Sequence, residues 1–330
     1  MKIIILAVVC LFILLFITTG CTRLVGGISK TKASHNLERY LQREYQGEVA
    51  FRALNRFFNA SNMDPNMFSV VIYNKMKPEI EFICFLNAKN ILVNDTLILN
   101  GLDRVPFNHL YKKAIKSYEA RQEIRSHFIN EISEINFNTA TIDLKIDHNI
   151  NAEDLVALTA RLINSMNRCY EELEIYFEIA LHIITPEHPE GFIKIPLEVR
   201  EYQWYPESFL LSENARGFQA IKTRIETHIQ TDLLQSHPDF EIFNYRKIFI
   251  DQSSLSKIAW VQYIRDKNIN NDGHGEWESP LKGIYISYID LQSGKLYKGE
   301  MMPRINPNMP YNEELKEIKK LLEAEGITAE

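Results

Sequence analysis

The sequence predicts an α+β fold in which antiparallel sheets pack against amphipathic helices. In several segments apolar residues recur with helical spacing, and between these segments short runs alternate apolar and polar side chains, as half-buried strands do. The strand-like runs come in sets of two to four, which favours antiparallel layers over a doubly wound parallel sheet. Of the 330 residues, 45% are hydrophobic and 24% charged, a balance that suits one large globular domain or two smaller ones.

The N-terminal part of the body, residues 36–136, is expected to combine two helices with a small group of strands. Pro106 suits the first turn of the longer helix, because a proline at that position loses no intrahelical hydrogen bond. The predicted elements are a helix over 36–45, strands over 67–73 and 79–87, a loop or weak strand over 87–103, and a helix from 106 to about 132.

The C-terminal part, residues 137–330, is expected to hold more strands than helices, and we place the boundary between the two parts near Phe137. Asn151 is a predicted N-cap, because its side chain can accept hydrogen bonds from the first-turn amides. Ser293 and Gly294 are predicted to form a hairpin turn, since glycine tolerates a positive φ. The predicted elements are strands over 141–147, 176–184, 193–200, 241–250, 255–266, 283–291 and 295–301, and helices over 151–172, 213–234 and 312–326.

The N-terminus carries the features of an export signal. Lys2 is followed by an apolar run over 3–17, in which the thiol of Cys10 is the only polar group. This run is shorter than the roughly 20 apolar residues of a membrane-spanning helix and has the length of a signal peptide's hydrophobic region. Residues 1–20 are therefore predicted to be a signal peptide.

The small residues Thr18, Thr19 and Gly20, followed by Cys21, resemble the lipobox of bacterial lipoproteins. The resemblance covers only the signal and its cysteine, and it departs from the family at Thr18, where leucine is commonest. It implies that Cys21 is diacylated and becomes the first residue of the mature protein, with 21–35 forming the lipidated cysteine and a flexible tether. An uncleaved signal anchor and ordinary cleavage without lipid are the alternatives, and all three export the body.

Composition and motifs exclude several classes of function. The net charge of -6 argues against a nucleic-acid partner, because binding phosphates requires clustered Lys and Arg. The chain contains no phosphate loop, Gly-x-Gly-x-x-Gly, His-Glu-x-x-His, Cys-x-x-Cys or Gly-x-Ser-x-Gly motif, so no cofactor is predicted.

We therefore expect a lipoprotein anchored by its lipid to the periplasmic face of the outer or inner membrane. Its body is expected to be a non-enzymatic module that binds a protein partner or takes part in envelope assembly. An immunity-type lipoprotein, which blocks a toxin delivered into the periplasm, is one form of this hypothesis. Solute capture for a transporter is a third reading, and it would require a deep cleft.

The alternative function is an anchored periplasmic hydrolase or metal-dependent enzyme. It predicts that His182, His188, His274 or Glu276 converge in one pocket, where histidine and carboxylate side chains can bind a metal or transfer protons. A pair of histidines at a strand end is more often a feature of a solvated loop, which is the other explanation of His182 and His188. Asp143 and Asp147 also share one face of a predicted strand, but Lys145 lies between them and a solvated strand face explains all three.

A polar loop near residue 272 holds weak candidate metal ligands. Its oxygen-bearing side chains are spaced like the front half of a calcium loop, with Gly273 at the sharp turn, but Ser279 stands where a bidentate glutamate is needed. A polar hairpin loop explains the same residues. The candidates are Asn268, Asn270, Asp272 and Glu276.

The aromatic residues Tyr202, Trp204 and Tyr205 are the weak candidates for partner binding. Amphipathic aromatic side chains supply contact area at a low entropic cost, and they are enriched at interfaces. Core packing is the alternative explanation for these residues. Cys84 and Cys169, the two cysteines of the body, are predicted to be buried thiols, with a disulfide between them as the other possibility.

Overall fold

The computed structural model describes residues 27–57, 63–99, 103–173, 179–267, 281–303 and 311–329. Within these ranges the predicted α+β fold is confirmed, since six helices accompany two sheets, one antiparallel with five strands and one mixed with ten. The chain divides into two compact units after Arg121, and each unit has a sheet of its own. Among the residues described, no helix is both long and apolar enough to cross a bilayer.

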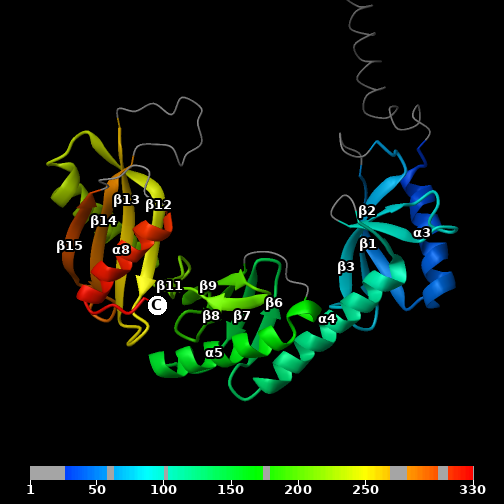
Figure 1. Ribbon diagram of the computed structural model, residues 1–330, viewed down its shortest axis with the longest axis horizontal. Coiled ribbons are helices and arrows are strands. Elements are labelled where there is room, and N and C mark those ends of the chain that lie inside the picture. The colour runs from blue at the N-terminus through cyan, green and yellow to red at the C-terminus, as the bar shows by residue number, and fades with distance from the viewer. Residues whose placement is uncertain are drawn as a thin grey trace, which may run out of the picture. The chain divides into compact units, whose positions relative to one another are not determined.

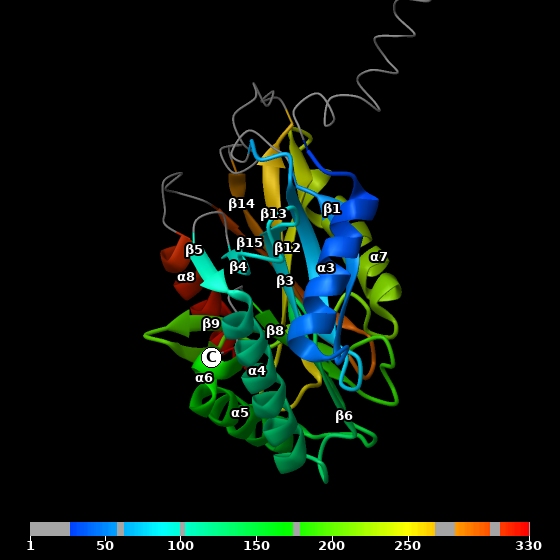
Figure 2. The same ribbon diagram turned by 90° about the vertical axis from the view of Figure 1, so that its right-hand side faces the viewer.

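The first unit is built on the five-stranded sheet, whose strands are neighbours in chain order. Figures 1 and 2 show its first helix lying along the sheet, and Leu37 of that helix joins one buried cluster with Ile72 and Leu86 of the strands. The strands predicted over 67–73 and 79–87 are confirmed. The elements are α3 (Lys30–Tyr45), β1 (Val49–Arg56), β2 (Met67–Asn74), β3 (Glu81–Asn87), β4 (Thr96–Leu99), β5 (Asp103–Pro106) and α4 (Phe107–His127).

The tether predicted over 21–35 is too long at its C-terminal end, because α3 begins at Lys30 rather than near residue 36. The Ser29 hydroxyl caps the helix by accepting from the Lys32 backbone N–H at 3.2 Å. Ile28 is buried, and its N–H donates to the Asn66 side chain at 3.0 Å. The polar composition of this stretch concealed a capped helix start.

Helix α4 begins at Phe107, because Pro106 ends strand β5 and does not lie in the first helical turn as predicted; the helix ends at His127 instead of near residue 132. A turn and the short strand β6 (Glu134–Phe137) follow it, and the Arg125 Nε donates to the Ile135 carbonyl at 3.0 Å. The predicted domain boundary near Phe137 therefore falls at the end of a strand, whereas the two units divide within α4.

The first half of the second unit contains one parallel strand pair, which differs from the antiparallel pattern expected from the sequence. Strands β7 and β8 run parallel, with Asp143 opposite His182. The connection through helix α5 carries the chain back to the end of the sheet at which β7 begins, so that β8 runs in the same direction. The predicted N-cap is present, since the Asn151 Oδ1 accepts from the Asp154 N–H at 2.9 Å. The elements are β7 (Thr141–Lys145), α5 (Ala152–Arg168), α6 (Tyr170–Leu173), β8 (Ile179–Ile184), β9 (Ile193–Arg200), β10 (Gln203–Pro206) and β11 (Leu210–Leu211).

The second half of this unit is a run of four antiparallel strands with helix α8 against one face (Figure 1). The helix predicted from residue 213 begins only at Phe218, because turns precede it and Gly217 has a φ of 83°. Gly294 has the positive φ predicted for its hairpin turn, 62°. The elements are α7 (Phe218–Ile229), a π-helical turn (Gln230–Leu234), β12 (Phe240–Ile250), β13 (Lys257–Asp266), β14 (Leu281–Asp290), β15 (Leu296–Pro303) and α8 (Tyr311–Ala324).

Asp251, which follows β12, holds the end of the described chain against the sheet. Its residue is only 2% exposed, and its carboxylate accepts from the Thr328 N–H at 3.0 Å and from the Ser253 N–H at 3.1 Å. The hydroxyls of Ser253 and Ser254 donate to it as well. Burial opposes ionisation, but the donated hydrogen bonds outweigh it and hold the pKa of Asp251 below its usual value.

We predict that Asp251→Asn lowers the free energy of unfolding at pH 7 by about 2 kcal/mol, because a charged acceptor is lost among fixed donors. Because the pKa of Asp251 is lower in the folded than in the unfolded protein, its carboxylate stabilises the folded state fully above the ordinary aspartate pKa of about 3.9. This stabilisation is lost as the pH falls through the pKa of the folded state. Urea unfolding of both proteins at pH 7 and pH 3 should therefore show a smaller difference at pH 3. Asp290→Asn is the control, because Asp290 accepts from Ser293 in an exposed turn, and it should lower the free energy of unfolding by less. An equal decrease in the two variants would contradict the prediction.

Both cysteines of the body are free thiols in the structure, and they differ in environment. Cys84 is buried in the core of the first unit, and burial raises its pKa to about 12. Cys169 is partly exposed at the end of α5, so its predicted burial is only partial, and burial, then Glu123 and Glu172, raise its pKa.

We predict that iodoacetamide at pH 8 modifies Cys169 at least tenfold faster than Cys84 in the folded protein, because the thiolate is the reactive form and must be reached by the reagent. Peptide mass spectrometry after timed quenching measures the two rates separately. In 6 M guanidinium the two rates should become similar. Equal rates in the native protein would show that the core around Cys84 opens freely.

Candidate functional site

Two groups of residues singled out by the sequence lie outside the described part of the chain. Cys21 precedes residue 27, and the polar loop with Asn268, Asn270, Asp272 and Glu276 lies in 268–280. Among the residues that the structure does describe, no group of three or more His, Cys, Asp or Glu side chains is arranged to hold a metal ion.

The aromatic residues Tyr202, Trp204 and Tyr205 lie on the hairpin formed by β9 and β10, which we call the aromatic hairpin (residues 199–205). Arg200 pairs with Gln203, so Glu201 and Tyr202 alone make the turn, with φ values of 49° and 62°. Positive φ at both central residues defines a type I′ turn, where asparagine and glycine are the usual residues. A glutamate and a tyrosine adopt this geometry only at a cost in backbone strain.

The three predicted contact residues differ in exposure. Tyr202 is 80% exposed and Tyr205 40%, so both rings are accessible, whereas Trp204 is 1% exposed and belongs to the core. Trp204 is therefore not part of the candidate contact surface, because side chains alternate between the two faces along β10 and the Trp204 ring points into the core. The Tyr170 ring supports the hairpin from α6, with its centroid 6.2 Å from that of Tyr202 and 5.6 Å from that of Trp204.

Asn167 fixes the aromatic hairpin to helix α5. Its side-chain oxygen accepts from the Trp204 N–H at 2.6 Å, and its amide nitrogen donates to the Trp204 carbonyl at 3.0 Å. These are the two main-chain groups that an added strand would need at this position of β10, whose only strand partner in the described part is β9. The side chain thus holds the hairpin and closes its open edge.

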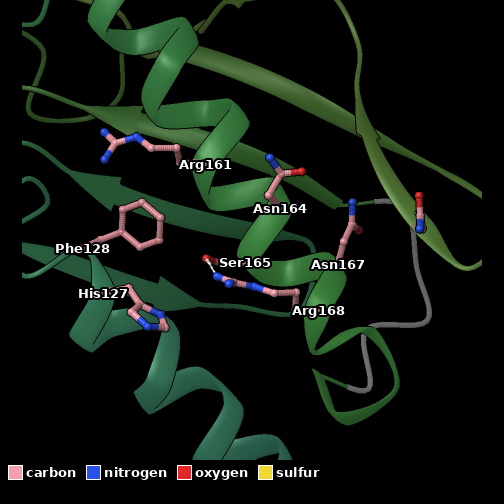
Figure 3. Close-up of a pocket in the computed structure, with 8 residues that line it drawn as sticks. His127, Phe128, Arg161, Asn164, Ser165, Asn167 and Arg168 are labelled. Carbon is pink, nitrogen blue, oxygen red and sulfur yellow. Dashed lines mark hydrogen bonds between the residues drawn. The ribbon is translucent and has the colours of Figure 1, made fainter.

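A hollow of about 610 Å³ adjoins the aromatic hairpin at Gln203. Figure 3 shows Arg168 folded back along α5 toward Ser165, to whose hydroxyl it donates at 2.9 Å. Of the residues placed by the structure, those around the hollow include two arginines and a histidine and no carboxylate. They are His127, Phe128, Arg161, Asn164, Ser165, Asn167, Arg168 and Gln203.

The two arginines of this hollow are not equivalent. Arg161 makes a two-point ion pair with Glu131, one contact being 3.0 Å, and its hydrogen bonds hold the pKa of Glu131 below the usual range. Arg161 is therefore already neutralised. Within the described part of the chain, Arg168 donates to one hydroxyl and pairs with no carboxylate, so its remaining N–H groups and its charge are available there to an anionic group of a ligand.

A second polar arrangement lies on the face of the sheet away from α5, and we call it the sheet-face cluster: Asp143, His182 and Ser212. The His182 Nδ1 lies 3.4 Å from the Asp143 Oδ1, and the His182 Nε2 lies 3.4 Å from the Ser212 Oγ. The parallel pairing of β7 with β8 sets the first contact, and Ser212, just after β11, completes the second. In the sequence Asp143 and His182 are separate candidates and Ser212 has no signal, because no spacing pattern connects three distant positions.

Neighbouring groups fix the sheet-face cluster. The Asn138 side chain donates to the Asp143 Oδ2 at 2.9 Å. Gly191, with a φ of 122°, lies against the imidazole so closely that a Cβ there would be 2.0 Å from the His182 Nε2. A hollow of about 400 Å³ opens beside the cluster, lined by Thr141, His182, Lys194, Leu210, Leu211, Ser212, Glu213, Asn214, Arg246, Lys247 and Ile248.

The two described residues of the predicted hydrolase or metal site, His182 and His188, do not converge. His188 lines a different hollow from His182, where its Nδ1 accepts from the Arg216 N–H at 3.0 Å and its ring stacks on Phe192. Burial, the largest effect, lowers the pKa of His188, so the ring serves as a neutral acceptor. His274 and Glu276 lie outside the described residues.

The carboxylates Asp143 and Asp147 do not form a pair either. Asp143 faces His182 on β7, whereas Asp147 is exposed beyond the end of that strand. The chemistry of this face therefore depends on the contacts of Asp143 with its neighbours from other strands. No protein-family model, curated protein or solved structure matches the chain.

Proposed function

We propose that the protein is an exported, lipid-anchored envelope lipoprotein whose body binds a protein partner. The observation that carries the binding part is the aromatic hairpin, which holds Tyr202 80% exposed on a backbone with positive φ. The lipobox-like start of the chain, ending at Cys21, supports the anchored part. An immunity-type role, in which the partner is a toxin, is one form of this function.

Strain at the turn supports a role for the tyrosine ring itself. Glycine or asparagine would relieve the backbone at the position of Tyr202, so the tyrosine is retained at a cost to stability. Because the ring is 80% exposed, its edge contact with the Tyr170 ring offsets little of this cost. Contact with another molecule would offset it.

The rigidity of the hairpin also favours binding. Asn167 ties its backbone to α5, and the Tyr170 ring packs against that of Tyr202. A surface that is already ordered loses little conformational entropy when a partner docks. Because Asn167 occupies the open edge of β10, the contacts should come from side chains and not from an added strand.

The adjoining hollow indicates the chemistry of the partner. Counting only residues that the structure places, Arg168 has N–H groups without a partner there, and Glu131, which pairs with Arg161, is the one carboxylate bonded to a lining arginine. We infer a protein segment that places a carboxylate against Arg168 and apolar side chains against Tyr202 and Tyr205. Charge-assisted hydrogen bonds of this kind fix orientation and weaken with salt.

We predict that Tyr202→Gly weakens partner binding at least tenfold while leaving the fold equally stable or up to about 1 kcal/mol more stable, because glycine tolerates the positive φ. Crosslinking and capture from solubilised envelopes, followed by affinity measurement on the purified partner, test the first part, and urea unfolding tests the second. Glu201→Asn, which relaxes the turn and keeps the ring, is the matched control and should bind normally.

Capture of a protein supports the proposal only if Tyr202→Gly abolishes the capture and Arg168→Gln weakens it, with a reduced dependence on salt. A protein captured equally by all variants would count as background. If wild-type bait repeatedly yields nothing that distinguishes it from Tyr202→Gly, the binding function is wrong.

We predict that Cys21→Ser releases the body from membranes or leaves an unprocessed chain, because the thiol carries the lipid. Intact-mass measurement of the detergent-extracted wild type should show loss of residues 1–20 and the added mass of acyl chains. Cys169→Ser, which changes a thiol of the body, should stay anchored. A Cys21→Ser protein that remains membrane-bound at its processed size without acyl groups would contradict the anchor.

A further inference from the structure

We propose that the sheet-face cluster of Asp143, His182 and Ser212 is a serine hydrolase site for small carboxylic esters that carry an anionic group. The proposal goes beyond partner binding, since it concerns a different face of the second unit and different residues. It stands on the two contacts of His182, which join an acid on one side and a hydroxyl on the other.

The cluster has the order carboxylate, imidazole and hydroxyl, which is the arrangement that activates a serine as a nucleophile. A base must lie beside the hydroxyl, and an acid on its other nitrogen must hold the imidazole in the right tautomer. The His182 nitrogens lie 3.4 Å from the Ser212 Oγ and 3.4 Å from the Asp143 Oδ1. These distances are longer than the roughly 2.6–3.2 Å of the reacting geometry, as is common in ligand-free sites that tighten when substrate binds.

The cluster is preorganised by its surroundings. The Asp143 Oδ1 is buried and makes no hydrogen bond within the described part of the chain, while Asn138 fixes the other carboxylate oxygen. An acceptor left open in this way can accept a hydrogen bond from the Nδ1–H of His182 after a small movement of the ring. Gly191 leaves just enough space for the ring, so the imidazole is confined between the glycine and Ser212.

The adjacent hollow defines the substrate class. At about 400 Å³ it suits a small molecule, and Leu210 and Ile248 give it apolar walls. Lys194 lies directly opposite His182 in the pairing of β8 with β9 and makes no ion pair within the described ranges, so it can bind an anionic group of the substrate. Among the groups placed by the structure, the N–H of Glu213, the residue after Ser212, donates no hydrogen bond and is available to the negative charge on the reacting carbonyl oxygen.

The reaction has two steps, acylation of Ser212 by the ester and hydrolysis of the acyl-enzyme by water. The Ser212 Oγ attacks the ester carbonyl carbon while its proton passes to the His182 Nε2, and the carbon–alkoxy bond then breaks as that proton moves to the departing alcohol. Water next attacks the acyl carbon and gives a proton to His182. The bond from the acyl carbon to the Ser212 Oγ breaks, the serine regains the proton, and the carboxylic acid leaves.

The test uses the full-length protein purified in detergent and a fluorophosphonate probe, which labels activated serines. Peptide mass spectrometry should find the label on Ser212 of the wild type, and pre-incubation with mono-4-nitrophenyl succinate, an ester with a carboxylate, should reduce labelling. Hydrolysis of that ester should fall at least a hundredfold in Ser212→Ala and in His182→Asn. Ser256→Ala, which removes a serine of the hollow that contains His188, should keep the wild-type rate and labelling.

Wild-type protein without label on Ser212, or ester hydrolysis unchanged in Ser212→Ala, would overturn the proposal. Site mapping in the wild type keeps the test valid even if a variant fails to fold. Partner capture by Ser212→Ala is measured in parallel: normal capture with no hydrolysis in the wild type would refute the hydrolase site alone, and hydrolysis without capture would refute the binding function alone.

Discussion

Strand β9 is the element on which both candidate sites depend, because it pairs with three other strands. Along one edge it pairs with β8; along the other its first residues pair with β11 and its last residues with β10. Pairing of β9 with β11 places Ser212 beside His182, and pairing of β9 with β10 places Tyr202 in the turn of the aromatic hairpin. A shift in its register would reverse which side chains face the core and would disperse both sites at once.

Much of the fold could be predicted from local patterns. Alternation of apolar and polar residues predicted β2, β3 and β9, and the cap at Asn151 and the turn at Gly294 followed from the chemistry of single residues. The errors fall where pairing with distant segments decides the structure. The parallel pairing of β7 with β8 has no signature in either strand alone. Strand β10 is a separate case, because it pairs with its neighbour β9 across a two-residue turn but is too short, at four residues, to show a strand pattern.

The candidate sites were only partly accessible to sequence reasoning, for a related reason. The exposure of Tyr202 and the burial of Trp204 depend on which face of β10 points outward, and an isolated aromatic run does not reveal this. Asp143, His182 and Ser212 lie on different elements, so their proximity follows from sheet order and not from spacing. Asp143, His182 and Tyr202 stood out in the sequence as single residues, whereas Ser212 and the contacts that join the cluster did not.

The side chain of Asn167 has a consequence for how copies of this protein behave when crowded. Each copy presents a short outer strand, and outer strands of neighbouring molecules tend to join into continuous sheets that seldom come apart. Here one amide already satisfies the groups through which such joining would begin at Trp204. At high local density the hairpins can therefore meet through their rings and separate again, instead of polymerising.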